Sequence, residues 1–326
     1  MTRRPHEDGV ALLTVLLLVA VMSAVATGIL DDIRFGLRRT ENARNVGQAQ
    51  WYAVGAEALA QARIRRLWET DRDRTPSPEQ WNGRVFEFPT DDGGVIRASV
   101  AEAGACFNLN SVVEGRNDLY LRRDLGVDQF VALARALGLS QGPALADALV
   151  DWIDTDSFRE GRGGEDEAYV GASPAYRTGG TLLSEVSELR AVRGFTPQVY
   201  ARLRPYVCAL PTSDLSPINL NTLPADKPEL ITMLTSGAVP RDAARQALAA
   251  RPAQGWSQVS EFWSLPALAR ASAPPEVLDQ AGLSTRFFAL TAEVTHVDAE
   301  VVMTALLEQT PAGPVRVRAR RWTLEE

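Results

Sequence analysis

The chain has 326 residues, of which 45% are hydrophobic and 23% are charged, and its formal net charge is −7. These proportions are typical of a globular protein with a sizeable core, and the length allows about two domains. The acidic balance, with no long run of Lys and Arg, argues against a nucleic-acid partner, because backbone phosphates must be neutralised by clustered basic side chains.

The N-terminus carries an uncharged apolar run of 21 residues, Val10 to Leu30, that begins directly after Gly9. A helix of this length spans about 31 Å and can cross a bilayer core. The polar leader before it holds Arg3 and Arg4, which predicts a cytoplasmic leader and a periplasmic remainder. A secretory signal is cleaved after its apolar stretch, whereas cleavage at Gly9 precedes it. The mature chain would therefore keep this helix.

The helical pattern continues to about residue 67, and its apolar side chains recur at helical spacing. This stripe is predicted to pack on a sheet and consists of Ile33, Leu37, Val46, Ala49, Ala53, Ala56, Leu59 and Ile64. Alternating segments predict strands at 85–88 and 95–100, joined by a turn at 91–94, and again at 287–297, 301–307 and 315–322.

Strands at both ends with helical patterns between them predict an α+β fold. In it, a long N-terminal transmembrane and amphipathic helix packs on a small antiparallel sheet, which a large all-helical insertion interrupts. The predicted parts are a leader at 1–9, a transmembrane segment at 10–30, the first sheet part at 31–110, the insertion at 111–282 and the second sheet part at 283–326.

The insertion contains a weak internal repeat. The segment 107–111 (FNLNS) matches 218–222 (INLNT), and 186–189 (VSEL) matches 259–262 (VSEF). We interpret the first pair as short extended pieces that end in helix-capping residues, and we predict a duplication.

Two cysteines, Cys106 and Cys208, are present without a Cys-x-x-Cys motif. An oxidising periplasm favours a disulfide between them, and the alternative is a pair of separate buried thiols.

The segment from Asp151 to Glu167 contains seven carboxylates and three glycines. Core-type residues bracket the acids, namely Trp152, Ile153, Phe158 and Tyr169, so the loop is expected to be folded and to need a counter-ion. Calcium is bound by six to eight carboxylate and carbonyl oxygens. The predicted ligands are Asp154, Asp156, Glu165 and Asp166, with Asp151 and Glu160 in reserve. The alternative is a solvated acidic loop without a metal.

Little in the sequence supports catalysis. Beyond His6 in the leader, only His296 remains, within an alternating strand pattern. Ser140 lies in a Gly-x-Ser-x-Gly pattern, but it follows a predicted helix rather than the strand that a nucleophile elbow requires. The chain is predicted to be non-enzymatic.

A short basic leader ending in Gly, followed at once by an apolar helix, resembles the type IV prepilin family. Residues 10–19 (VALLTVLLLV), 47–61 (GQAQWYAVGAEALAQ) and the acidic segment resemble one subfamily, minor pseudopilin K of type II secretion. The resemblance implies processing between Gly9 and Val10 by a prepilin peptidase, methylation of the new amine, and calcium in the acidic loop.

The resemblance also implies a place in the bacterial inner membrane, at the tip of the pseudopilus, where the protein primes assembly and supports export. Its implied partners are the minor pseudopilins I and J, with H below them, and the inner-membrane secretion machinery. The fifth mature residue is Thr14, where most pilin-like subunits have a Glu that pairs with a neighbour's N-terminal amine. Pseudopilin K lacks this Glu, which fits a subunit that caps a filament.

Two other functions compete with this interpretation. The first is a signal-anchored periplasmic enzyme stabilised by calcium, which would not need Gly9 directly before the apolar helix. The second is a competence-type DNA-binding protein that uses 184–206 and 222–255, which resemble helix-hairpin-helix units. The acidic charge disfavours this second function, and we interpret both segments as packing units.

Overall fold

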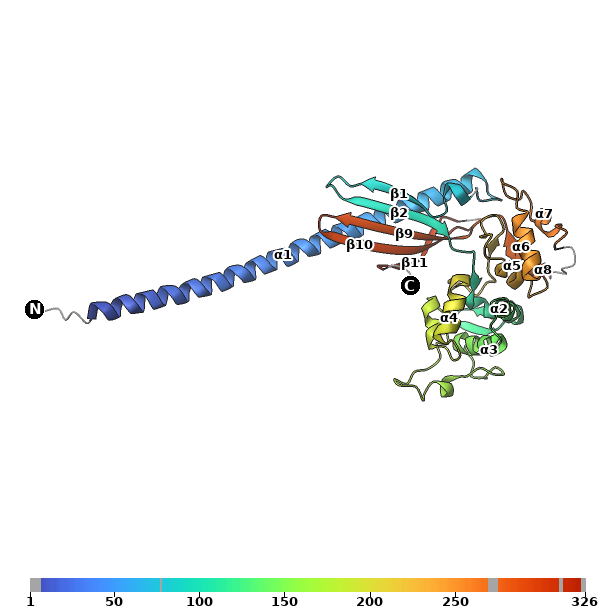
Figure 1. The fold of residues 1–326 in the computed structure, drawn as a ribbon, viewed down its shortest axis with the longest axis horizontal. Coiled ribbons are helices and arrows are strands. Elements are labelled where there is room, and N and C mark those ends of the chain that lie inside the picture. The colour runs from blue at the N-terminus through green and yellow to red at the C-terminus, as the bar shows by residue number, and fades with distance from the viewer. Residues whose placement is uncertain (1–6, 77, 269–274, 311–312, 324–326) are drawn as a thin grey trace, which may run out of the picture.

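A computed structural model describes residues 7–76, 78–268, 275–310 and 313–323. One helix, α1 (Glu7–Thr70), is 64 residues long, and its N-terminal half extends far from the rest of the molecule (Figure 1). Within the described ranges, α1 contains the one segment that is long and apolar enough to cross a membrane. The chain thus consists of an extended stem and a head.

The head is built on a five-stranded antiparallel sheet against which the second half of α1 packs (Figure 1). Its strands are β1 (Arg84–Pro89), β2 (Val95–Glu102), β9 (Phe287–His296), β10 (Ala299–Glu308) and β11 (Arg316–Arg321), in that spatial order. The first and last strands of the chain therefore share one sheet, and the predicted α+β fold class is confirmed. The predicted turn between β1 and β2 is formed by 91–94, with Gly93 at φ +82°.

Small side chains let α1 lie close to the sheet. The face of α1 buried against it consists of Ala49, Ala53, Ala56, Ala60 and Ile64. Opposite them, the apolar face of β9 and β10 includes Leu290 and Met303. The predicted stripe was wrong at Ile33 and Leu37, which lie in the exposed part of α1 before its contact with the sheet begins. It was also wrong at Leu59, which is exposed because the sheet covers a narrower face of the helix than the sequence pattern suggested.

Between β2 and β9 the chain leaves the sheet and forms the insertion, which has its own hydrophobic core. Its helices are α2 (Asp124–Ala136), α3 (Gly142–Ile153), α4 (Pro197–Leu203), α5 (Glu229–Leu234), α6 (Arg241–Ala249), α7 (Val259–Trp263) and α8 (Pro275–Gln280). It extends a few residues beyond both predicted limits, since β2 ends at residue 102 and β9 begins at residue 287.

The insertion is not purely helical as predicted, because each of the two repeated segments forms a short strand that pairs with another short strand. Among its described residues, two of three small sheets are parallel: β3 (Phe107–Asn108) pairs with β6 (Val207–Cys208), and β7 (Ile218–Asn219) pairs with β8 (Ala281–Gly282). The third joins β4 (Val113–Arg116) to β5 (Leu119–Arg122). Two-residue strands carry too little alternation to be seen in the sequence.

Hydrogen bonds confirm the predicted duplication. In the first copy, the Asn110 side chain accepts from the backbone N–H of Leu183 and donates to the same residue's carbonyl, at 2.8 and 2.9 Å. In the second copy, the Asn221 side chain makes the same two bonds to Trp256, at 2.8 and 3.1 Å. Leu183 and Trp256 each lie three positions before the repeated Val-Ser-Glu. In each copy, the side-chain amide of one Asn therefore joins the Asn-Leu-Asn segment to the Val-Ser-Glu segment.

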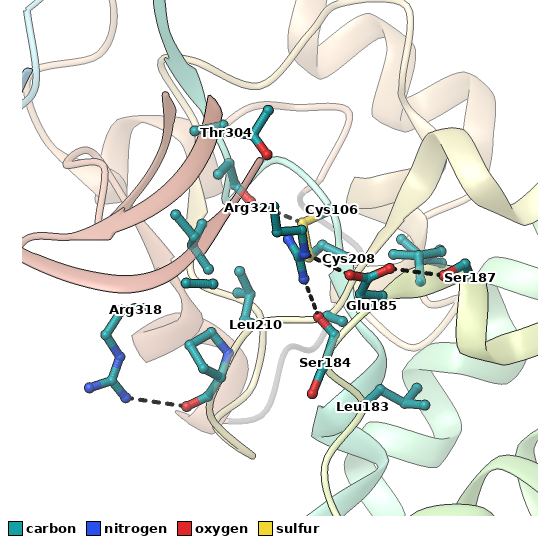
Figure 2. Close-up of a pocket in the computed structure, with 18 of the residues that line it drawn as sticks. Cys106, Leu183, Ser184, Glu185, Ser187, Cys208, Leu210, Thr304, Arg318 and Arg321 are labelled. Carbon is teal, nitrogen blue, oxygen red and sulfur yellow. Dashed lines mark hydrogen bonds and ion pairs between the residues drawn. A yellow bond between two sulfur atoms is a disulfide. The ribbon is translucent and has the colours of Figure 1, made fainter. Parts of the chain in front are cut away.

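The insertion is held to the sheet at a junction on the side away from α1. Cys106 and Cys208 form a disulfide there, and the Arg321 guanidinium of β11 lies 2.6 Å from the Glu185 carboxylate (Figure 2). Where the chain leaves the sheet at the end of β2, the Glu102 carboxylate accepts hydrogen bonds from the hydroxyls of Thr222 and Thr285. Burial raises the pKa of Glu102, while these hydrogen bonds favour its charged form.

Candidate metal centre

The acidic segment is positioned by the end of α3. The helix buries Asp151 in its last turn and ends at Ile153, where Asp154 becomes extended while its N–H still donates to the Val150 carbonyl at 2.8 Å. The loop that follows folds back on the helix, because the Glu160 N–H donates to Asp151 Oδ1 at 2.9 Å. Acids that are distant in sequence are thereby brought together.

Three carboxylates converge in this loop. One oxygen from each of Asp154, Asp156 and Glu165 lies within 4.8 Å of the others. Asp154 Oδ1, Glu165 Oε1 and the adjacent Asp151 Oδ2 are buried and have no hydrogen-bond partner among the described residues. Leaving a buried charged oxygen unpaired is costly, so these atoms are candidate ligands for a cation.

Electrostatics support this interpretation. Burial, followed by repulsion from Asp156 and Glu165, raises the pKa of Asp154 to about 8. Burial, followed by repulsion from Asp151 and Asp156, raises the pKa of Glu165 to about 7. The pKa of Asp151 is raised to about 6, again chiefly by burial. Without a cation the cluster therefore resists full ionisation near neutral pH.

Two other acids of the segment, Asp166 and Glu160, are already paired. Asp166 Oδ1 accepts from the N–H and the hydroxyl of Thr178, both at 3.0 Å, and its Oδ2 lies 3.7 Å from Arg177. Asp166 therefore does not join the cluster to which it was assigned, and the reserve residue Asp151 lies next to that cluster instead. The other reserve, Glu160, is bound by Arg122 at 3.1 Å.

The sequence analysis did not predict the charged residues Arg122 and Asp147, which hold the loop around the cluster. Arg122 also contacts Asp147 at 3.3 Å, and Asp147 Oδ2 accepts from the Arg162 N–H at 3.0 Å. The available signal was the spacing of Asp147 and Asp151, which places both carboxylates on one face of a helix. Arg122 gave no such signal, because it comes from β5 and reaches the loop only through the fold.

The loop is folded, as expected, but one bracketing residue is not part of its core. Trp152 and Tyr169 are buried with ring centroids 5.3 Å apart, and Tyr176 packs against both. Phe158 is 82% exposed, because the Asp156 side chain accepts its N–H and turns the chain outward. At Gly163, a Cβ would lie 2.2 Å from Asp151 Oδ2, so only glycine allows this close approach.

The donor set fits a hard cation such as calcium. It offers carboxylate oxygens from three residues, with a fourth carboxylate beside them, and it includes neither Cys nor His. Bound calcium would stabilise the charged form of each ligand and tie the loop to the end of α3.

The other predicted residues lie apart from this centre. Gly9, Val10 and Thr14 are all within α1, and the Thr14 hydroxyl donates to the Ala11 carbonyl at 2.9 Å. His296 is the buried last residue of β9. Ser140 lies in a turn between α2 and α3, which is not a strand-to-helix elbow.

A long apolar helix packed on a small antiparallel sheet, with a large helical insertion, defines a pilin-like subunit whose stem is long and apolar enough to span a membrane. Models of the family described as type II secretion system (T2SS), protein K match residues 105–212 and 218–285. The chain belongs to this family of minor pseudopilins. The two matched ranges correspond to the two copies of the duplication.

Relatives of the whole chain support the same family. Type II secretion system protein K of Pseudomonas aeruginosa is 33% identical over 325 residues, which cover 97% of this chain and 93% of the relative. The protein K of Klebsiella pneumoniae is 37% identical over 265 residues, 81% of each chain. A chain in the crystal structure of the GspK-GspI-GspJ complex from enterotoxigenic Escherichia coli is 27% identical, with a TM-score of 0.72 over 88% of this chain.

Proposed function

We propose that this protein is a non-enzymatic subunit at the tip of the type II secretion pseudopilus, where it primes assembly and supports export across the outer membrane. The observation that carries the proposal is Thr14. The fifth residue after Gly9 has no carboxylate, and its hydroxyl is already used within its own helix. Such a subunit offers no acidic partner to the N-terminal amine of a following subunit, as expected of a cap.

The shape of the head agrees with an end position. The insertion lies at the end of the molecule remote from the N-terminus and projects to the side of the sheet (Figure 1). A lateral domain of this size in every subunit would obstruct the stacking of neighbouring stems. At the end of a filament it obstructs nothing.

The partners follow from this position. We infer that the stem and adjoining head surfaces contact the minor pseudopilins I and J, with H below them. Support comes from the solved relative, which belongs to a GspK-GspI-GspJ complex. A prepilin peptidase would cleave after Gly9 and methylate Val10, and the head would face the periplasm beside the inner-membrane secretion machinery.

We also propose that the acidic loop binds structural calcium through Asp154, Asp156 and Glu165, with Asp151 as the fourth carboxylate. The orphaned buried oxygens support this ligand set. Calcium would fix a loop whose own charges repel one another, and would thereby keep the first half of the insertion in one conformation.

Processing is tested at the leader. Gly9→Leu is expected to abolish cleavage and secretion, because a prepilin peptidase needs a small residue at the cut. The measurements are the N-terminal sequence of the membrane-purified protein and the secreted fraction of a type II substrate. Gly28→Leu is a matched control, since Gly28 has open space around it on α1. Normal processing of Gly9→Leu would favour a signal-anchored protein instead.

The tip position is tested at Thr14. Thr14→Glu is expected to let another subunit add beyond this one, because a carboxylate in the bilayer is stabilised only by a paired cation such as a neighbouring amine. We expect several-fold more copies of this chain per pseudopilus, counted by quantitative mass spectrometry. Thr14→Gln has nearly the same shape without the charge and should leave the copy number unchanged. An unchanged number with Glu would contradict the capping role.

A further inference from the structure

The two edge strands of the head sheet differ in their contacts. The side chains of β11 reach the insertion, where Arg318 donates to the Pro211 carbonyl at 3.4 Å and Arg321 pairs with Glu185. At the opposite edge, β1 pairs only with β2 in the part of the chain that the structure describes. The free edge of β1 therefore presents unpaired backbone donors and acceptors, which can template another strand.

An apolar groove of about 420 Å³ lies beside this open edge. The last turns of α1 form one wall with Leu59 and Leu67, and the β1–β2 hairpin forms the other with Phe86, Phe88 and Ala98. Leu59 is 55% exposed and Phe88 is 39% exposed. Exposed large apolar side chains gathered in a concave surface indicate a binding site rather than scattered surface residues.

The charges around the groove have one sign. Arg63 and Arg66 line it, and Arg84 lies at its rim, with guanidinium carbons 4.2 Å (Arg63) and 5.6 Å (Arg84) from the centre of the Phe86 ring. No carboxylate within the described ranges lies at ion-pair distance from any of these three arginines. In a chain of net charge −7, three guanidinium groups around an apolar groove that form no ion pair with a described carboxylate predict an acidic occupant.

We propose that an extended, acidic and apolar segment of another polypeptide binds here by adding to β1 as a sixth strand. Its backbone would pair with the free edge of β1. Because alternate side chains of a strand share one face, its apolar residues would enter the groove and a carboxylate on that face would reach Arg63 and Arg66. This proposal does not depend on the tip position or on calcium.

The charge preference is tested with two defined peptides and the full-length protein in lipid nanodiscs. The first peptide, Glu-Thr-Val-Thr-Phe-Thr-Val-Thr, places its acid and apolar residues on one face, and the second has Lys in place of Glu. Fluorescence anisotropy of labelled peptides is expected to show binding of the acidic peptide at least about tenfold tighter than that of the basic one.

The matched variants test where the peptide binds. The double variant Arg63→Glu and Arg66→Glu is expected to reverse the preference, so that the Lys peptide binds more tightly, which also shows that the variant is folded. Arg65→Glu is the control, because Arg65 lies outside the groove and pairs with Glu69 at 4.0 Å. Equal binding of both peptides, or the same reversal with Arg65→Glu, overturns the proposal.

Strand addition is tested with N-methylated acidic peptides. Only alternate N–H groups of an added strand face β1, so methylating one alternate set should abolish binding and methylating the other should preserve it. Loss or retention of binding with both sets contradicts strand pairing. Preference for a helical peptide of the same composition would instead identify a helix as the occupant and would also contradict the proposal.

Discussion

Asp154→Asn is expected to weaken calcium binding by at least about 100-fold and, at the same time, to stabilise the calcium-free protein. The first effect follows because Asp154 supplies one of three converging oxygens. The second follows because burial and like charges raise its pKa to about 8, so folding of the metal-free protein at neutral pH requires Asp154 to take up a proton that it does not bind in the unfolded state. The amide removes this penalty, which we place on the order of 2 kcal/mol.

The pH dependence has a defined sign. The unfolded pKa of an Asp is about 3.9, well below the folded value of about 8, so the folded state binds more protons between these two values. The free energy of unfolding of the calcium-free protein should therefore fall as pH rises through this window, with a further contribution from Glu165 up to about pH 7. Calcium affinity should rise over the same range, because the metal displaces protons.

Calorimetry measures both effects. Titration gives the calcium affinity, and thermal unfolding with calcium or with a chelator gives the stability. Wild-type protein should gain about 2.7 kcal/mol at a calcium concentration 100 times the dissociation constant, whereas Asp154→Asn should gain almost nothing. Asp166→Asn is the matched control, because Asp166 lies in the same loop but is held by Thr178 and Arg177. Equal effects of the two variants would contradict the ligand set.

Removing the disulfide with the double variant Cys106→Ser and Cys208→Ser is expected to destabilise the insertion by roughly 4–5 kcal/mol, because the bond closes a loop across 102 residues. Changing both cysteines avoids a lone reactive thiol. The effect should be largest in the first copy of the duplication, which holds both cysteines. The second copy closes its equivalent strand pair, β7 with β8, without a disulfide.

Hydrogen exchange locates this effect. Amides of residues 105–212 should lose the most protection in the double variant, and those of 218–285 should lose less. Amides of the sheet should change little, since the sheet has a separate hydrophobic core. The wild-type protein treated with reductant is the second test and should show the same pattern. Uniform loss of protection, or no loss, would show that the disulfide does not support the first copy specifically.

The sequence by itself determined the stem, the sheet and the duplication. The apolar run before the head, the alternation of β9 and β10, and the repeated Asn-Leu-Asn are local patterns whose period or spacing follows from backbone geometry. The acidic segment was visible for the same reason, since its charge is concentrated in consecutive residues.

Only the tertiary structure decided which acids meet and which surfaces stay open. Asp166 was indistinguishable from Asp154 in the sequence, but Thr178 and Arg177 occupy its carboxylate, and both reach it through the folding of the loop. Likewise, Leu59 belongs to the same helical stripe as Ala56, yet the sheet covers Ala56 and leaves Leu59 beside an open groove. Such contacts depend on the placement of distant segments, which a local pattern does not encode.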